Sequence, residues 1–529
     1  MDKQVFVDLP RKRISRKKQK NGTTYIYYRT NFRRNERGKA TFDETAIGKL
    51  DEGSGKLIPN RNYYEVYLGE SVDHVRSVKT LGLTFVLNRI VRDLKLDKIM
   101  SPIFESTQEL LALAYYVLAR GNVVVYAQDW IEGNAWTQSA PCLYSSKIGR
   151  LFENISYEQR LDFFERWAKQ QTQREYWYYD VASVSSYGRQ IDFLEWGYDR
   201  EGEPLPQLNV GLCYGAVTQL PLFYRAYNGS ITDKTYFTFL LQDFPFLDSD
   251  FPIYLVTDQG FITRDNLQTT GQESKRFRVL SSLPLYLKDA QRILSDYGPS
   301  VKQDAHYLRE EHVYGRRIVD TVLDQSVNIY LYYDIEKAAY DTKQFYESLL
   351  RTETELQALK RSQLNSKRYR QYFKIDVTNE QSFTYERDSK AIDDYLKTCG
   401  YYVLLSTGPD LSPSEALRRY RQKDLIVEQF YQLKNEIDYL ELKTHNRKTT
   451  EGKLFIGFIA LILRSYLLNL LKSLPDKIRP SISKLIIELE KIKVIETKGG
   501  KRSLTPLTKK QKEILEALNI SEDELGKAA

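Results

Sequence analysis

The pattern of apolar and polar positions changes near residue 173. From about residue 71 to that point, apolar residues recur at helical spacing, for example over 108–118 and 156–169. Downstream, short apolar and aromatic runs separated by turn residues predict strands at 176–183, 208–217, 220–227 and 251–257. Thr232 or Asp233 can begin a helix between the third and fourth of these strands. The chain therefore changes from a helical region to an α/β region.

Two of the predicted strands carry an aspartate where an unpaired, buried carboxylate would be costly. Asp180 lies inside the first run, and Asp258 ends the fourth run just before Gly260. The order strand, strand, strand, helix, strand is that of a ribonuclease H-like core, in which the first and fourth strands are neighbours. We therefore predict an α/β fold, a ribonuclease H-like mixed sheet flanked by helices, in which the two aspartates lie side by side.

The pattern after residue 262 does not continue this core. Strands at 313–323, 327–333 and 400–406 and a long charged helix at 342–371 predict a β-rich insertion. Ser412 and Glu415 then form a capping box with proline at the first helical position, which predicts a helix that continues to Lys434. Glu428 lies near the edge of the apolar packing face of this predicted helix. The apolar run at 455–471 is short and contains Arg464, so we expect a buried core helix rather than a membrane span.

These changes divide the chain into six regions. We expect a basic N-terminal arm with β structure, a helical region that would suit DNA binding but could equally serve packing, the first part of the α/β core, the insertion, the second part of the core, and a small C-terminal region. Their predicted ranges are 1–70, 71–172, 173–261, 262–410, 411–475 and 476–529.

Charge and aromatic content suggest a nucleic-acid partner. The net charge is only +8, but seven of the ten residues 11–20 are positive, beginning with Arg11, Lys12 and Arg13. The chain also has 40 tyrosines, and aromatic rings beside cations suit stacking and backbone contact with nucleic acid. The basic block could be a solvated tail, but its position beside a Tyr-rich strand favours an arm that contacts phosphates.

Several other classes of protein are disfavoured. Three scattered cysteines and no apolar signal region predict a cytoplasmic, nucleoid-associated protein without a disulfide framework. Four scattered histidines give no structural zinc site. The run Gly53-Ser54-Gly55-Lys56 imitates a phosphate-binding loop, but it lacks the first glycine and the Ser or Thr after the lysine, which excludes an NTPase of that type.

Three acidic residues are the candidate chemistry. Two carboxylates about 4 Å apart repel by about 4 kcal/mol at an effective dielectric near 20, so a cluster of three requires a cation. Oxygen ligands select Mg²⁺ or Mn²⁺, and two such ions can activate a water or 3′-hydroxyl against a phosphodiester. We assign Asp180 to bridge both ions, Asp258 to one and Glu428 to the other. Singly, each acid could be a turn former, a helix cap or a surface residue. Asp424 is expected to be a structural partner of a nearby cation.

The chain resembles the DDE transposases of bacterial insertion sequences, specifically the insertion-sequence-four type. The resemblance covers roughly residues 175–470 and rests on the segments Asp180–Gly188, Leu212–Gly229, Val256–Phe261, Tyr420–Lys434 and Glu451–Leu463. It implies that Asp180, Asp258 and Glu428 are the catalytic triad. It also implies a dimer that binds terminal inverted repeats in double-stranded DNA, cleaves the ends as an endonuclease, and joins the 3′-hydroxyls to target DNA, often through a hairpin intermediate.

The family also carries a tyrosine and two basic residues around the glutamate. Tyr420, Lys423 and Lys434 match best as phosphate contacts, although strict spacing would select Asp424 and Asn435. All five tryptophans precede residue 200, so stacking on a flipped base would fall to tyrosine or phenylalanine. Two alternatives stay open: a ribonuclease H-like nuclease that cuts without joining, and a non-catalytic DNA-binding derivative.

Overall fold

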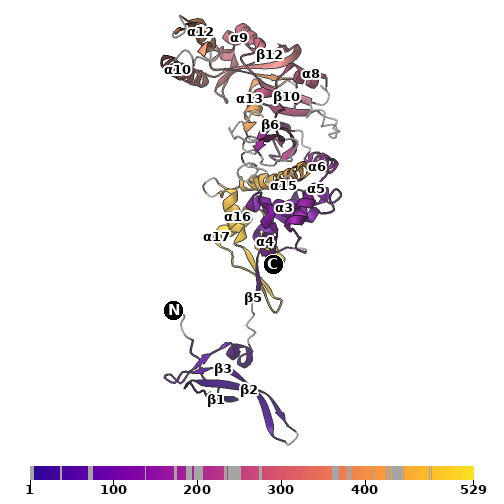
Figure 1. The fold of residues 1–529 in the computed structure, drawn as a ribbon, viewed down its shortest axis with the longest axis vertical. Helices are drawn as coiled ribbons and strands as arrows, with labels where there is room; N and C mark the ends of the chain where they lie inside the picture. The colour runs from indigo at the N-terminus through magenta and orange to yellow at the C-terminus, as the bar shows by residue number, and fades with distance from the viewer. Residues whose placement is uncertain are drawn as a thin grey trace. The chain divides into compact units, whose positions relative to one another are not determined.

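The chain forms two compact units in a computed structural model (Figure 1). One unit comprises Met1–Leu81, Ile492–Leu507 and Asp523–Ala529, and the other comprises Gly82–Lys491 and Thr508–Glu522. The structure describes residues 5–35, 38–69, 75–136, 139–171, 175–185, 194–195, 206–231, 235, 237, 252–272, 277–359, 369–377, 383–408, 410–424, 427, 431, 444, 446–475, 477 and 479–529.

The first unit contains two small antiparallel sheets. Strands β1 to β4 pair in sequence order around a core of Ile26, Ile47, Leu57 and Tyr63. In the other sheet β17 lies between β18 and β5. The bounds are β1 Ile14–Lys18, β2 Thr24–Arg34, β3 Ala40–Leu50, β4 Leu57–Pro59, β5 Val75–Thr80, β17 Lys493–Thr497 and β18 Arg502–Leu504, with the short helix η1 at Tyr63–Tyr67. The basic segment that we expected as an arm therefore contains a paired strand, β1.

The second unit begins with helices, as the apolar spacing predicted. Ser156 and Gln159 form a capping box that starts α6, so the sequence signal there corresponds to real hydrogen bonds. The helices are α1 Gly82–Asp93, α2 Leu96–Met100, α3 Thr107–Arg120, η2 Val124–Tyr126, α4 Ala127–Gly133, α5 Ser145–Glu153 and α6 Tyr157–Gln170.

A nine-stranded mixed sheet follows, in the order β11-β12-β13-β16-β10-β9-β6-β7-β8. Strands β6, β7 and β8 pair antiparallel, whereas β6, β9 and β10 pair parallel. Five strands therefore have the ribonuclease H-like order, with the first and fourth side by side, and the predicted fold class is confirmed. Their bounds are β6 Tyr176–Ser185, β7 Gln207–Gly215, β8 Pro221–Asn228, β9 Ile253–Thr257 and β10 Phe277–Leu283. The helix expected between β8 and β9 lies mostly outside the described residues.

The sheet continues past the predicted boundary at residue 262. Strand β10 lies beyond it and is the fifth strand of the core, while β16 pairs with β10 and brings β13, β12 and β11 into the same sheet. These strands cover the edge that β10 would otherwise expose. The elements are η4 Gln259–Phe261, α8 Arg264–Gln272, α9 Lys288–Val301, η5 Asp304–His306, β11 Tyr307–Leu308, β12 Val313–Val322, β13 Gln325–Tyr333, α10 Ile335–Ala358, β14 Phe373–Val377, β15 Phe383–Arg387, α12 Ser389–Leu396 and β16 Tyr401–Ser406.

The remaining helices are α13 Pro413–Arg421, α15 Arg447–Leu471, α16 Ile482–Glu490, α17 Lys509–Ala517 and α18 Glu522–Ala528. Helix α15 is long and apolar enough to cross a membrane, but 78% of its apolar window is buried inside the protein. It packs against α3 and α5 as a core helix. Gly452 sits where α15 approaches α5: a Cβ at this position would lie 2.3 Å from the carbonyl oxygen of Phe152.

Candidate active site

The pairing of β6 with β9 determines where the two aspartates lie. Tyr176 is opposite Tyr254, and Tyr178 is opposite Val256. Two residues further along both parallel strands, the same register reaches Asp180 and Asp258. Asp258 follows the last paired residues in extended conformation, with φ −79° and ψ 168°. Because side chains two residues apart share a face and neighbouring strands lie about 4.8 Å apart, the two aspartates occupy adjacent positions on one face.

Helix α13 supplies the polar groups around Asp258. The helix begins at Ser412, whose side chain accepts a hydrogen bond from the backbone N–H of Glu415, as predicted. At its other end the Tyr420 hydroxyl donates to Asp258 Oδ1 at 3.2 Å, and Lys423 Nζ lies 3.9 Å from the same oxygen. Burial, followed by the negative charge of Asp258, raises the pKa of Tyr420. The phenol therefore stays protonated and keeps donating to the carboxylate.

Contacts with β6 hold α13 on the face that carries the aspartates. The Arg419 guanidinium lies 3.9 Å from the centre of the Tyr176 ring, and the Tyr178 hydroxyl donates to Gln422 Oε1 at 3.0 Å. Burial raises the pKa of Tyr176 to about 12, with Arg419 acting in the opposite direction. Tyr176, Tyr178 and Asp180 alternate along one strand, so the helix that packs on the tyrosines also approaches the acids.

The structure brings Tyr420 and Lys423 into contact with Asp258, and the register of β6 and β9 leads to Asp180 at the neighbouring position. Glu428 and Lys434 lie outside the described residues, and among the residues that are described no group of three or more His, Cys, Asp or Glu forms a metal cluster. Arg11, Lys12 and Arg13 lie in the first unit. The expected cation partner of Asp424 is confirmed, since Lys423 Nζ is 3.6 Å from Asp424 Oδ1.

Sequence reasoning missed Arg419 and Gln422 as residues that dock α13. The available signal was the basic run Arg418, Arg419 and Arg421 at the end of the helix. Such a run is typical of a solvated helix end that complements the helix dipole. The stacking of Arg419 on Tyr176 can be recognised only once the tertiary fold is known.

The carboxylate oxygens of Asp180 and Asp258 are suitable ligands for a hard divalent cation. The third proposed ligand, Glu428, lies outside the described residues. Two carboxylates at adjacent strand positions offer oxygen ligands, and the Asp258 side chain is 49% exposed, which leaves it accessible. Asp180 Oδ1 accepts a hydrogen bond from the Val181 backbone N–H at 2.8 Å, which orients that carboxylate. The two carboxylates can therefore offer oxygen ligands to one cation on this face of the sheet.

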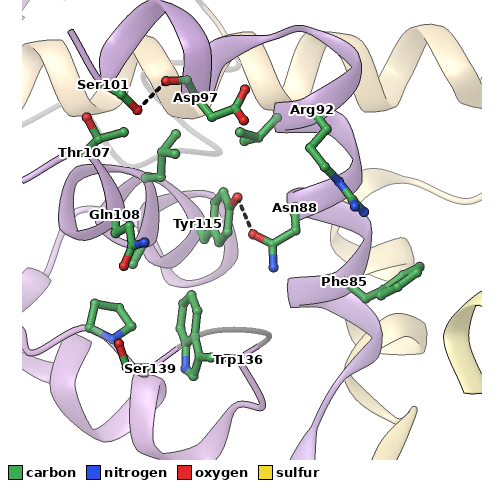
Figure 2. Close-up of a pocket in the computed structure, with 14 residues that line it drawn as sticks. Phe85, Asn88, Arg92, Asp97, Ser101, Thr107, Gln108, Tyr115, Trp136 and Ser139 are labelled. Carbon is green, nitrogen blue, oxygen red and sulfur yellow. Dashed lines mark hydrogen bonds between the residues drawn. The ribbon is translucent and has the colours of Figure 1, made fainter. Parts of the chain in front are cut away.

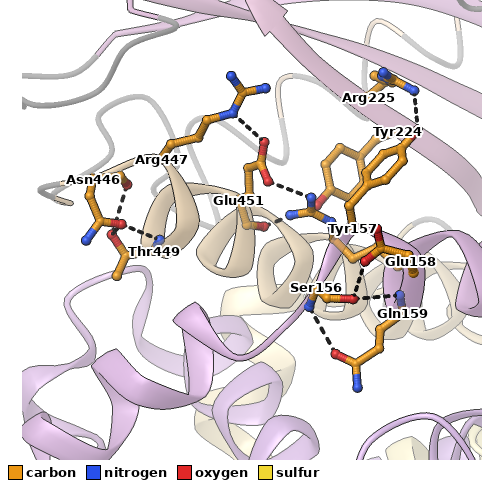
Figure 3. A network of polar contacts seen from close by, with 11 residues as sticks. Ser156, Tyr157, Glu158, Gln159, Tyr224, Arg225, Asn446, Arg447, Thr449 and Glu451 are labelled. Carbon is orange, nitrogen blue, oxygen red and sulfur yellow. Dashed lines mark hydrogen bonds and ion pairs between the residues drawn. The ribbon is translucent and has the colours of Figure 1, made fainter.

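A second polar cluster joins α6, α15 and edge strand β8 (Figure 3). Arg160 Nη2 lies 2.6 Å from Glu451 Oε2, and Arg447 Nε lies 3.0 Å from Glu451 Oε1. The Tyr224 hydroxyl donates to the Glu451 backbone carbonyl at 3.4 Å. Burial alone would raise the pKa of Glu451, but the two guanidinium groups outweigh it and the pKa is lowered. The Arg160 side chain is only 8% exposed, so this ion pair belongs to the core.

The lowered pKa of Glu451 predicts an acid-sensitive contribution to stability. A carboxyl with a depressed folded-state pKa stabilises the fold above its ordinary value of 4.5, and this contribution is lost as pH falls through the folded-state value. Glu451→Gln should therefore lower the melting temperature at neutral pH and flatten its fall below about pH 5. The matched control Glu513→Gln, at an exposed position of α17, should keep the wild-type profile in a thermal melting series. An unchanged profile for Glu451→Gln would contradict this role.

A cavity of about 420 Å³ lies within the helical region, away from the strands (Figure 2). The Tyr115 hydroxyl donates to Asn88 Oδ1 at 3.0 Å, and the Tyr115 and Trp136 rings are parallel with centroids 6.4 Å apart. Its lining includes residues of α1 to α3 together with Trp136, Ser139 and Pro141. Neither Asp180 nor Asp258 is among the described residues that line it.

Comparison with known proteins adds one structural similarity. No model of a known protein family matches the chain, and no curated protein sequence matches it. Among solved structures, the chain is similar to a piggyBac transposase in a synaptic complex with hairpin DNA, with 10% sequence identity and a TM-score of 0.37, over 72% of this chain and 68% of that chain. The strand order and the paired acids define the class: a mixed α/β protein with a ribonuclease H-like sheet and two aspartates on adjacent core strands.

Proposed function

We propose that this protein is a DNA transposase that uses a DDE site for phosphodiester hydrolysis and strand transfer. The observation that carries the proposal is the register of β6 and β9, which puts Asp180 and Asp258 at adjacent positions. Tyr420 and Lys423 lie against Asp258. They are the best matches in this sequence to the phosphate contacts of insertion-sequence transposases, although Lys423 is one residue from the strict spacing.

In this proposal Asp180, Asp258 and Glu428 would hold two Mg²⁺ or Mn²⁺ ions, with Asp180 as the ligand common to both. When bound, such ions activate the attacking water or 3′-hydroxyl and stabilise the leaving oxygen. Tyr420 fixes the orientation of the Asp258 carboxylate through its hydroxyl. Lys423 places a positive charge within 3.9 Å of that carboxylate, where it can offset the charge of an incoming phosphate.

The partners follow from this chemistry. The protein binds the terminal inverted repeats of its element and a target duplex, and two copies pair in the DNA complex. Arg11, Lys12, Arg13 and Lys434 contact DNA phosphates and position the duplex without reading its sequence. The Trp-free second half of the chain leaves tyrosine or phenylalanine to stack on any unpaired base.

Product analysis distinguishes joining from cutting. A duplex that ends in the terminal repeat and is labelled at its 3′-end is incubated with the protein, Mg²⁺ and a supercoiled plasmid. We expect the label to become joined to the plasmid, because the acids can activate a 3′-hydroxyl as well as water. Cleavage without joined label would indicate the nuclease alternative, and DNA binding without cleavage would indicate a non-catalytic derivative. Either result would overturn strand transfer.

A further inference from the structure

The net positive charge of the chain is concentrated at one end. Residues 1–69 contain 16 basic residues (Lys and Arg) and 8 acidic residues, which gives a net charge of +8. The whole chain contains 78 basic and 70 acidic residues, so its net charge is also +8. The other 460 residues therefore have as many acids as bases and no net charge. Long-range attraction of a polyanion must act chiefly on the four-stranded sheet that these first residues form.

Within that sheet, β2 and β3 extend beyond their neighbours. Strand β1 pairs only with residues 24–28 of β2, and β4 pairs only with residues 48–50 of β3. Farther out β2 and β3 pair with each other, with Thr30 opposite Asp43 and Arg34 opposite Ala40. We call this outer part, residues 29–35 and 38–46, the ribbon; it projects from the sheet in Figure 1.

The ribbon is stiffened by two neighbouring aromatic rings, each with a guanidinium group against it. The Arg13 guanidinium lies 5.4 Å from the Phe32 ring, Phe32 lies 5.7 Å from Phe42, and the Arg29 guanidinium lies 4.3 Å from Phe42. Phe32 is nevertheless 53% exposed. A lone two-stranded hairpin is marginally stable in water, so these contacts explain how the ribbon stays formed without a third strand.

The end of the ribbon presents donors for nucleic acid. The described residues 31–35 and 38–41 are all exposed, and they include Arg33, Arg34 and Lys39. Arg33 Nη2 is 2.8 Å from Asp43 Oδ1, and hydrogen bonds from Asn31 and Arg33 lower the pKa of Asp43, so that acid is held within the ribbon. Guanidinium and ammonium groups contact the phosphates that border the major groove, and guanidinium groups can also read base edges within it.

We infer that the ribbon enters the major groove of duplex DNA and is the principal duplex-binding element of the chain. The major groove, about 12 Å wide, admits a two-stranded ribbon without deformation of the duplex, whereas the minor groove, at about 6 Å, would first have to be widened at a cost in free energy. This inference rests on the proposed function only in taking DNA as the partner. It assigns the groove and the residues that enter it.

The charge of the ribbon is tested in the full-length protein with duplex DNA. The variant Arg33→Ala/Arg34→Ala/Lys39→Ala is compared with Lys498→Ala/Lys501→Ala/Lys509→Ala, which removes the same charge from exposed positions elsewhere. Loss of about three phosphate contacts should reduce the slope of log affinity against log salt by about 2 to 3 and weaken binding about 100-fold at 0.1 M salt. The control should bind like the wild type, and circular dichroism should show both variants folded.

The groove is tested with duplexes whose cytosines carry a glucosylated hydroxymethyl group, which fills the major groove, and with netropsin, which fills the minor groove. We expect the glucosylated duplex to bind at least tenfold more weakly and netropsin to have little effect. If the triple variant keeps the wild-type salt slope, or if the glucosylated duplex binds normally, the ribbon inference is overturned while DNA binding stands. If the wild type binds no duplex at all, the proposed function fails with it.

Discussion

Replacing Asp180 by asparagine should abolish Mg²⁺-dependent cleavage of terminal-repeat DNA while leaving the fold and DNA affinity unchanged. Asp180 occupies the strand position adjacent to Asp258, and in the proposed site it bridges both ions. Losing several kcal/mol of charge stabilisation in the transition state corresponds to a fall in cleavage rate of about 1000-fold or more. Single-turnover cleavage of a labelled duplex measures the rate, and a gel-shift titration measures the affinity.

Asp424→Asn is the matched control. Asp424 lies near the same site and is paired with Lys423, but its side chain is 81% exposed and it has no catalytic role in our assignment. It should cleave within a few-fold of the wild type, whereas Asp258→Asn should behave like Asp180→Asn. Normal cleavage by Asp180→Asn would overturn the whole assignment of the acids.

Substituting Gly452 by alanine should destabilise the second unit severely. The added Cβ would lie 2.3 Å from the carbonyl oxygen of Phe152 and 2.7 Å from its carbonyl carbon and Cα. All three are backbone atoms, so relief requires α15 and α5 to move apart rather than a side chain to turn. We expect a loss of about 3 kcal/mol, at the upper end of overpacking costs, and a melting temperature lower by several degrees.

Gly149→Ala is a control in α5, the helix that Gly452 contacts, and it should change stability in the opposite direction. Gly149 lies inside α5, and a Cβ there would meet nothing within 4 Å. Alanine in a helix interior is about 0.5–1 kcal/mol better than glycine, so this variant should melt at or slightly above the wild-type temperature. Equal melting temperatures for the two variants would show that the α15–α5 contact can relax without cost.

The core and its acids were predictable because the signals are local. Aromatic and β-branched runs around Asp180 and before Asp258 specify strands, and the order of strands and helix specifies which become neighbours. The start of α13 was predictable for the same reason, since Ser412 and the proline after it act within one turn. The sequence pattern predicted the start of the long charged helix at residue 342, but α10 begins at Ile335. Its start also has a local signal, because Asp334 accepts a hydrogen bond from the Lys337 backbone N–H and caps the helix.

The extent of the sheet was not predictable in this way. Strand β10 follows α8 and reads like any short apolar run, and only its pairing with β9 and β16 shows that it belongs to the core. The docking of Arg419 on Tyr176 likewise joins residues more than 240 positions apart. Such pairings depend on which surfaces remain to be covered after the local elements form, and one sequence does not contain that information.

The continuity of the sheet also has a consequence for biosynthesis. Leu280 of β10 is paired with Ser406 of β16, so a ribosome must add more than 120 residues before β10 acquires its second neighbour. During that interval the five core strands β6 to β10 can pair, but the outer edge of β10 stays open to other nascent chains. Slow translation between residues 284 and 400 should therefore increase aggregation, and a chaperone that covers strand edges should act on this protein before its synthesis is complete.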